Sequence, residues 1–320
     1  MPSQTGTETP QNDAGSYVDD AELYDVGSGK WYDAGTGSMF HFARFSGALL
    51  PDGRAIFAGG QNETPGASTN LLVATCAPDC TYSSSQSLAA PRRSAPVVVT
   101  GRGAVIVNGL LAAGPAFSEV YDFTGVLSGL TAAAPYATKM AAAVQLGVGD
   151  LYVCGGEQGS TALGTVMTLP AHDGGWSVAS AALTTGRYGA TLTSLLDGGM
   201  LCIGGLTMSN NTASGEISFL SLSGQTGTTH QLMDPRGNHS ASLFNGDVLI
   251  CGGLNLSTPL SSCERVDASG TSTNSIGMHE LRYGHSAHVL SDGTVLVTGG
   301  SPDAGCISER FDGGQWTCLP

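Results

Sequence analysis

The chain has 320 residues, 41% of them hydrophobic, so it is long enough and apolar enough to bury a sizeable core. Its 26 Asp and Glu residues outnumber its 12 Lys and Arg residues, which gives a formal net charge of −14. This charge argues against binding to nucleic acid or to an anionic membrane surface. We also expect no membrane insertion, because the sequence has no run of about 20 apolar residues.

The first part of the chain differs in composition from the rest. Residues 1–20 are rich in Ser, Thr, Gly, Asn, Asp and Pro, and they lack the apolar stretch of a signal peptide. We therefore predict a flexible N-terminal segment over 1–20 and a single repeat domain over 21–320.

A β-hairpin that ends in two glycines recurs along this domain. Its clearest copy spans residues 282–300, where two apolar runs flank an Asp-Gly turn. Six copies end at Gly60, Gly109, Gly156, Gly205, Gly253 and Gly300, at intervals of 47 to 49 residues. Since no long amphipathic helical pattern is present, this regularity predicts an all-β repeat protein.

A second kind of hairpin follows each of the first. It begins with a pattern such as Ser118-Glu119-Val120-Tyr121-Asp122, and its second strand contains all three tryptophans, at 31, 176 and 316. Each repeat of about 48 residues thus has four antiparallel strands, as in a blade of a β-propeller. Residues 21–34 form a seventh outer hairpin, although the sequence has only six inner hairpins. We expect six blades with 21–34 as an extra edge or flap; the alternative is a seven-bladed protein that has lost its first inner hairpin.

The repeat resembles that of kelch proteins over residues 21–320. The double glycine, the Tyr-Asp type of dipeptide and the spaced Trp are marks of the family, and the stretch that opens with Arg282 and His285 resembles bacterial kelch sequences. The resemblance implies a kelch-repeat β-propeller.

The eight cysteines are even in number and lie at spacings that suit pairing between strands. The candidate disulfides are Cys76 with Cys80, Cys251 with Cys263, Cys306 with Cys318, and Cys154 with Cys202. Disulfides would place the protein in an extracellular or periplasmic compartment, so we expect a secreted protein. Free buried cysteines in small core sites are the alternative.

A cation opens each inner hairpin, and two histidines follow it in consecutive repeats. The residues are Arg44, Arg93, Lys139, Arg187, Arg236 and Arg282, with His239 and His285. Near the propeller axis they could bind an anionic ligand at the channel mouth. The structural alternative is that each Arg pairs with a repeated Glu and that the histidines belong to the ordinary strand opening.

The sequence predicts a non-catalytic binding scaffold for a protein or carbohydrate ligand, engaged in protein interaction. We expect a monomer with no cofactor, no metal and no catalytic residue. The alternative is a propeller enzyme that acts on a sugar or alcohol. Galactose-oxidase-type copper enzymes would need residues such as Tyr188, Tyr283 and Cys202. A sialic-acid mutarotase type could use Glu157 and Arg187 as acid–base and binding groups.

Overall fold

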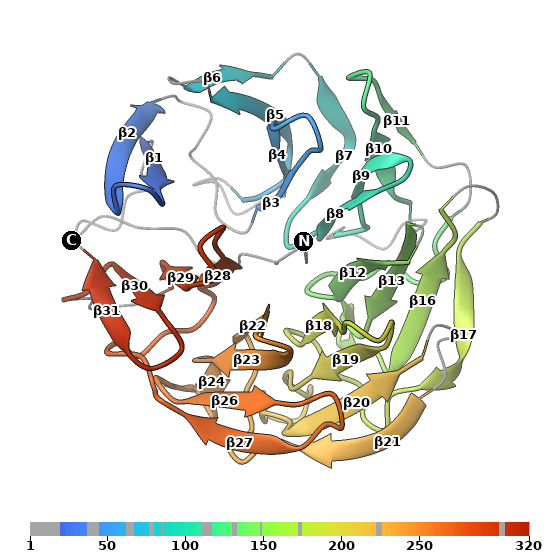
Figure 1. Cartoon of the computed structure of the whole chain (residues 1–320). Helices are drawn as coiled ribbons and strands as arrows, with labels where there is room; N and C mark the ends of the chain where they lie inside the picture. Colours follow the sequence, from blue (N-terminus) through green and yellow to red (C-terminus); the bar gives the residue numbers. More distant parts are fainter. Residues whose placement is uncertain are drawn as a thin grey trace.

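The computed structural model describes residues 20–36, 45–61, 67–76, 80–84, 86–109, 117–129, 133–147, 149–171, 175–221, 226–300 and 305–319. Every regular element within these ranges is a β-strand, and the strands form six four-stranded antiparallel blades around a centre (Figure 1). The prediction of six blades is confirmed. The predicted flexible segment lies outside the described residues, except for Asp20, which opens a strand.

The first three blades are built from consecutive stretches of the chain. The first contains β3 (Ser46–Leu49), β4 (Ala55–Ala58), β5 (Ser68–Cys76) and β6 (Cys80–Ser83), with β7 (Ser87–Arg92) also paired to β5. The second contains β8 (Val97–Thr100), β9 (Gly103–Ile106), β10 (Glu119–Tyr121) and β11 (Leu127–Gly129). The third contains β12 (Ala142–Leu146), β13 (Asp150–Cys154), β16 (Thr165–Leu169) and β17 (Ser177–Ala182), and a small hairpin of β14 (Glu157–Gln158) and β15 (Thr161–Ala162) interrupts it.

The other three blades follow the same order. The fourth contains β18 (Thr191–Ser194), β19 (Met200–Ile203), β20 (Glu216–Leu220) and β21 (Thr226–Gln231). The fifth contains β22 (Ser240–Phe244), β23 (Asp247–Cys251), β26 (Cys263–Val266) and β27 (Ser272–Ser275), with a small hairpin of β24 (Leu254–Asn255) and β25 (Thr258–Pro259). The sixth contains β28 (Ser286–Val289), β29 (Val295–Thr298), β30 (Ser308–Phe311) and β31 (Trp316–Leu319).

The extra hairpin consists of β1 (Asp20–Asp25) and β2 (Lys30–Thr36), which form a separate two-stranded sheet. It lies between the sixth and first blades (Figure 1). The indole of Trp31 donates to the Ser308 hydroxyl at 3.2 Å, and the Tyr82 hydroxyl donates to the Ala34 carbonyl at 2.7 Å. Residues 21–34 are thus an extra edge element held by both neighbouring blades.

The hydrophobic core is divided into layers between neighbouring blades. One layer joins Tyr152 and Val166 of the third blade to Leu192 and Met200 of the fourth, and Met200 has no exposed surface. The alternation of apolar and polar residues along the strands directs each apolar side chain to such a layer. Adjacent blades therefore stabilise each other by burying the faces of their sheets.

The double glycines join each blade to the next through the backbone. At four blade junctions the second glycine donates its N–H, over 2.7 to 2.9 Å, to the carbonyl of the Arg that opens the next blade; the pairs are Gly60–Arg92, Gly156–Arg187, Gly205–Arg236 and Gly253–Arg282. At the junction of the second and third blades Gly109 donates to Thr138. A Cβ on the first glycine, Gly252, would lie 2.5 Å from the Arg282 carbonyl oxygen, and its φ is +64°. Only glycine fits this approach.

A second series of backbone hydrogen bonds runs along the inner edge of the blades. Its residues adopt positive φ values between 49° and 64°, and the series is Ser94, Met140, Gly189, Asn238 and Gly284. The N–H of each later member donates to the carbonyl of the preceding one, at 2.8 to 3.1 Å. These bonds, which we call the inner chain, hold the second to sixth blades at a fixed spacing around the centre.

All four predicted disulfides are confirmed: Cys76–Cys80, Cys154–Cys202, Cys251–Cys263 and Cys306–Cys318. The alternative of free buried cysteines is wrong, because all eight are bonded. Cys154–Cys202 links the third blade to the fourth, since these residues end β13 and occupy β19. Four disulfides are typical of proteins that fold in an oxidising compartment.

Replacing Gly252 by Ala should lower the free energy of unfolding by about 3 kcal/mol, because left-handed backbone strain adds to a clash with the Arg282 carbonyl. The matched control is Gly246→Ala. Gly246 has a φ of +89° and nothing within 4 Å of the added carbon, so this variant reports strain alone, about 1 kcal/mol. Urea unfolding of both variants measures the difference. Equal losses would show that the close approach of the blades is unimportant.

Candidate functional site

Four buried arginines pair with glutamates inside the blades. The guanidinium groups of Arg92, Arg187, Arg236 and Arg282 have no exposed surface, and they form ion pairs with Glu119, Glu216, Glu264 and Glu309 at 2.7 to 3.1 Å. In the fourth blade Ser218 occupies the strand position of Glu264, and Glu216 reaches Arg187 from two residues earlier. The predicted structural alternative, Arg paired with the repeated Glu, is thus confirmed for Arg187, Arg236 and Arg282.

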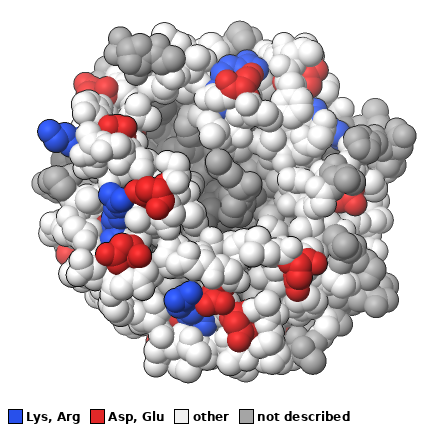
Figure 2. Space-filling model, viewed as in Figure 1, with Lys and Arg blue, Asp and Glu red and all other residues white. Residues whose placement is uncertain are grey.

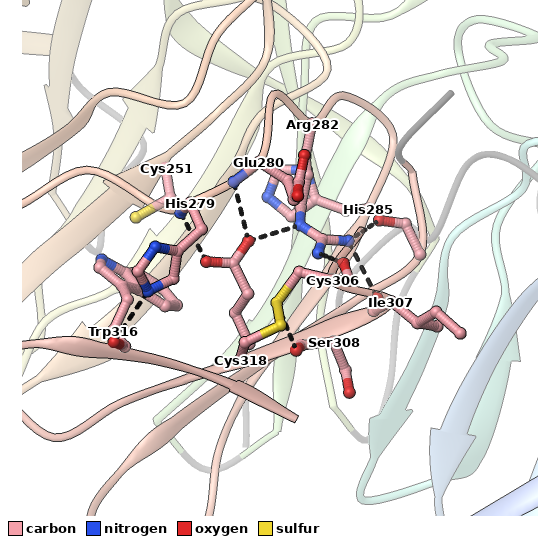
Figure 3. A network of polar contacts seen from close by, with 12 residues as sticks. Cys251, His279, Glu280, Arg282, His285, Cys306, Ile307, Ser308, Trp316 and Cys318 are labelled. Atoms are coloured by element: carbon pink, nitrogen blue, oxygen red, sulfur yellow. Dashed lines mark hydrogen bonds and ion pairs between the residues drawn. A yellow bond between two sulfur atoms is a disulfide. The ribbon is translucent and has the colours of Figure 1, made fainter. Parts of the chain in front are cut away.

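The Arg282 network shows why these charges can be buried (Figure 3). Arg282 Nε donates to Glu309 at 3.1 Å, and its Nη1 donates to the carbonyls of Gly299 and Ile307 at 2.8 and 3.0 Å. The other carboxylate oxygen of Glu309 accepts from the His279 backbone N–H at 2.6 Å. These contacts replace the hydrogen bonds that the two charged groups would make to water, so the pair can be buried. Because the contacts are directional, they fix the blade geometry.

The arginine position lies one residue earlier than predicted in two repeats. Arg92 pairs with Glu119, whereas Arg93 donates to the side chain of Gln61 at 2.7 Å. In the third blade Thr138 takes the arginine position, and Lys139 follows it. Arg44 lies outside the described residues. The spacing of 27 residues in Arg92–Glu119, equal to that in Arg282–Glu309, is the sequence signal that could have identified Arg92.

The predicted anion site at the channel mouth would need these guanidinium groups to be accessible. Arg187, Arg236 and Arg282 are instead enclosed, and burial lowers the pKa of the Arg187 and Arg236 guanidiniums while their glutamates oppose the fall. An anion could reach them only if the ion pairs with glutamate opened. The ligand-binding role of the cations therefore stays a prediction.

His239 and His285 lie close together, as predicted, and each contacts the preceding blade. His239 Nε2 is 2.9 Å from the Thr191 hydroxyl, and His285 Nε2 is 2.8 Å from the Ser240 hydroxyl. Burial lowers the pKa of both imidazoles to about 3, with further contributions from the charges of Arg236 and Arg282. Both rings are thus neutral at physiological pH and can exchange hydrogen bonds with hydroxyl groups.

The two histidines line a small hollow that is open to solvent. The rest of its wall consists of members of the inner chain and one alanine: Met140, Gly189, Ala190, Asn238 and Gly284. We call this the axial hollow. The described charged side chains lie around the centre of the molecule (Figure 2). The wall carries no formal charge, so it suits a neutral polar ligand better than an ion.

A partly exposed ion pair lies beside the hollow on the third blade. Lys139 Nζ is 2.7 Å from Glu157 Oε1, and their side chains are 22% and 14% exposed. The two backbones exchange hydrogen bonds at 2.9 and 3.1 Å. Tyr188 of the next blade packs with Leu206 and Ala213, and Met140 of the hollow wall packs against the same cluster. Glu157 is thus largely buried, and its backbone pairs with that of Lys139, the chain neighbour of Met140.

The residues present do not fit a copper–radical site of the galactose-oxidase type. That site needs a cysteine joined to a tyrosine, but Cys202 is bonded to Cys154. The Tyr188 hydroxyl is 2.5 Å from Asn211 Oδ1. Among the described residues, no group of three or more His, Cys, Asp or Glu side chains could hold a metal ion. We therefore assign no step of a reaction to copper.

Two solved structures are similar to this chain. One is YjhT, with a TM-score of 0.67 and 14% identity over 87% of this chain and 97% of that one. The other is a fungal alcohol oxidase of the AA5 family in complex with copper, with a TM-score of 0.69 and 17% identity over 99% of this chain and 71% of that one. Neither a protein-family model nor a curated protein matches the sequence.

The chain is a kelch-type β-propeller, as its repeats predicted. The prediction of a non-catalytic scaffold is wrong, because one of the two similar structures is an alcohol oxidase. This similarity favours the enzymatic alternative. At these identities the likeness itself concerns the fold, and the activity has to be argued from the site. Over the described ranges, no helix is long and apolar enough to cross a membrane.

Replacing Arg282 by Ala should lower the free energy of unfolding by about 3 to 5 kcal/mol, because Glu309 would remain buried without its partner. The matched control is Arg310→Ala, which breaks the partly exposed pair with Asp292 and should cost less than about 1 kcal/mol. Denaturant unfolding compares the two. A small loss of unfolding free energy in both variants would show that the buried pair does not stabilise the fold.

The histidines should make stability depend on pH. Their folded pKa values, about 3, lie below the ordinary value of 6.5, so the unfolded chain binds more protons between these limits. The free energy of unfolding should fall as the pH drops below 6.5 towards 3, by up to about 1.4 kcal/mol per pH unit for each histidine. The double variant His239→Gln/His285→Gln should flatten this slope in thermal unfolding, while His230→Gln should preserve it. An unchanged slope in the double variant would contradict the buried neutral state.

Proposed function

We propose that this protein is an exported enzyme that acts on a sugar or an alcohol bound at the axial hollow. The observation that carries the proposal is the hollow itself: a neutral polar wall, with two uncharged imidazoles, at the centre of a rigid ring of blades. Hydroxyl-rich ligands match such a wall because they need hydrogen bonds and carry no charge to desolvate. The four disulfides support export.

The existing contacts of the histidines indicate how a ligand hydroxyl would bind. Each imidazole already bonds a Ser or Thr hydroxyl through Nε2. The Nδ1 atom of His285 has no hydrogen-bond partner in the described part of the chain. A buried nitrogen without a partner is costly, and a ligand hydroxyl would reach this one only if the ring turned toward the hollow. The net charge of −14 further favours neutral substrates over acidic ones.

The reaction that the site supports best is proton transfer without a redox cofactor. Cys202 cannot form the crosslink of a copper–radical enzyme while it is bonded to Cys154. Interconversion of the anomers of a reducing sugar needs only an acid and a base, and it consumes no co-reactant. A carbohydrate is thus the partner that we propose, bound by a monomer.

The purified protein should accelerate anomer exchange of at least one sugar among galactose, glucose, xylose and N-acetylglucosamine. Magnetisation-exchange NMR measures the rate between the two anomeric signals. His285→Ala should weaken sugar binding and slow the exchange at subsaturating sugar, because it removes a neutral donor and acceptor from the wall. After incubation with copper, peroxide should not be released from galactose or from a primary alcohol. Wild-type protein that accelerates none of the four exchanges would overturn the proposal, and peroxide release would replace it by an oxidase.

A further inference from the structure

Asn238 lines the axial hollow with an amide that has no partner in the protein. Its Oδ1 atom is buried and accepts no hydrogen bond within the described ranges. A Cβ on Gly189 would lie 2.3 Å from this oxygen, so the amide lies across the glycine of the preceding blade, which also lines the hollow. A buried polar atom without a partner calls for an explanation, and a ligand bound in the hollow supplies one.

The other polar groups of the wall are already used inside the protein. The backbone N–H groups of the inner-chain residues that line the hollow each donate to the preceding member. His239 and His285 hold hydroxyl groups of the preceding blade through Nε2, and their Cε1 atoms lie 2.7 Å from where a Cβ on Gly204 or Gly252 would be. Asn238 can therefore bond a ligand without breaking a hydrogen bond of the protein.

The rest of the wall is apolar. It contains Met140, Ala190 and the two glycines of the inner chain. Met140 has a φ of +54°, a conformation that residues other than Gly, Asn and Asp rarely adopt. Backbone strain of this kind is common at ligand sites. Since Met140 also packs against the apolar cluster that includes Tyr188, this side of the hollow suits a hydrocarbon group of a ligand.

The hollow is small, so it accommodates one edge of a sugar rather than a whole ring. We propose that this edge is the methyl-bearing edge of a 6-deoxyhexose, an inference that rests on the proposed function. The methyl group on C5 contacts Met140 and Ala190. The neighbouring C4 hydroxyl bonds the Asn238 amide, which turns about its Cβ–Cγ bond to offer its oxygen or its nitrogen.

The same wall selects against ordinary hexoses. A hexose brings a hydroxymethyl group to the place of the methyl group. Its C6 hydroxyl would then be buried against apolar surface with no partner, because the one free amide already bonds the C4 hydroxyl. An unpaired buried hydroxyl costs binding free energy, so the site should prefer the sugar that lacks it.

Binding of methyl glycosides tests this preference apart from turnover, because they have no free anomeric hydroxyl and cannot exchange anomers. One pair of probes is methyl α-L-fucopyranoside and methyl α-L-galactopyranoside; the other is methyl α-L-rhamnopyranoside and methyl α-L-mannopyranoside. The members of each pair differ only in the C6 hydroxyl. In NMR titrations the 6-deoxy member of at least one pair should bind about tenfold more tightly than its partner. Equal or weaker binding of the 6-deoxy member in both pairs would overturn the proposal.

Variants locate the two contacts. Asn238→Gly removes the amide and tolerates the positive φ, as Gly189 does, so it should fold and weaken binding of the preferred 6-deoxy glycoside about fivefold. The matched control Asn274→Ala changes an exposed residue of β27 in the same blade and should bind as the wild type does. Met140→Ser introduces the residue that the second blade has at this position, Ser94, and should reduce the preference within the pair. Wild-type affinity of folded Asn238→Gly would contradict the assignment.

Binding and turnover together separate this inference from the proposed activity. If a 6-deoxy glycoside binds as expected but the protein accelerates anomer exchange of no free sugar, L-fucose and L-rhamnose included, the enzymatic proposal is wrong and the hollow is a sugar-binding site. If anomer exchange is accelerated but neither pair of glycosides is discriminated, the activity stands and the preference for 6-deoxyhexoses is wrong.

Discussion

The hydrogen bond between a glycine N–H and the carbonyl that opens the next blade is the contact on which the rest of this propeller depends. It forms at five junctions in the described part of the chain, four times to an arginine and once to Thr138. At four of these junctions a glycine precedes the donor and allows the backbones to approach, and at the fifth Asn108, with a φ of +47°, takes that place. The inner chain and the apolar layers between blades then follow from the spacing that this contact sets.

Two kinds of polar side chain use that spacing differently. The buried arginines hold the blades from within, since their carbonyls accept from the glycines while their guanidiniums meet the glutamates. The histidines line the centre and stay neutral because the same packing excludes water from them. The third blade needs no internal charge pair, because its neighbours and the Cys154–Cys202 bond hold it. Lys139 and Glu157 of this blade form a partly exposed ion pair instead.

The sequence was sufficient to predict the architecture. Regularly spaced double glycines, Asp-Gly turns and tryptophans reflect local conformational requirements of the chain. Six blades and all four disulfide pairs could therefore be predicted. The site was harder. Arg92 and Arg93 are adjacent, and the pairing register of β10 places Glu119 against Arg92. That Met140 and Ala190 line the hollow beside the histidines depends on packing between blades, which no local pattern encodes. The scaffold prediction failed because a repeat describes the fold and not the chemistry.

Residue-resolved amide hydrogen exchange of the intact protein is the most direct test of these backbone contacts. The second glycines and the inner chain should exchange only by global unfolding, so Gly156, Gly205, Gly253 and Asn238 should belong to the slowest class. The amides of Lys139 and Glu157, which bond each other at the exposed edge of the third blade, should exchange faster. Rapid exchange of the glycine amides would show that the blades are not joined through their double glycines and would contradict this account of the ring.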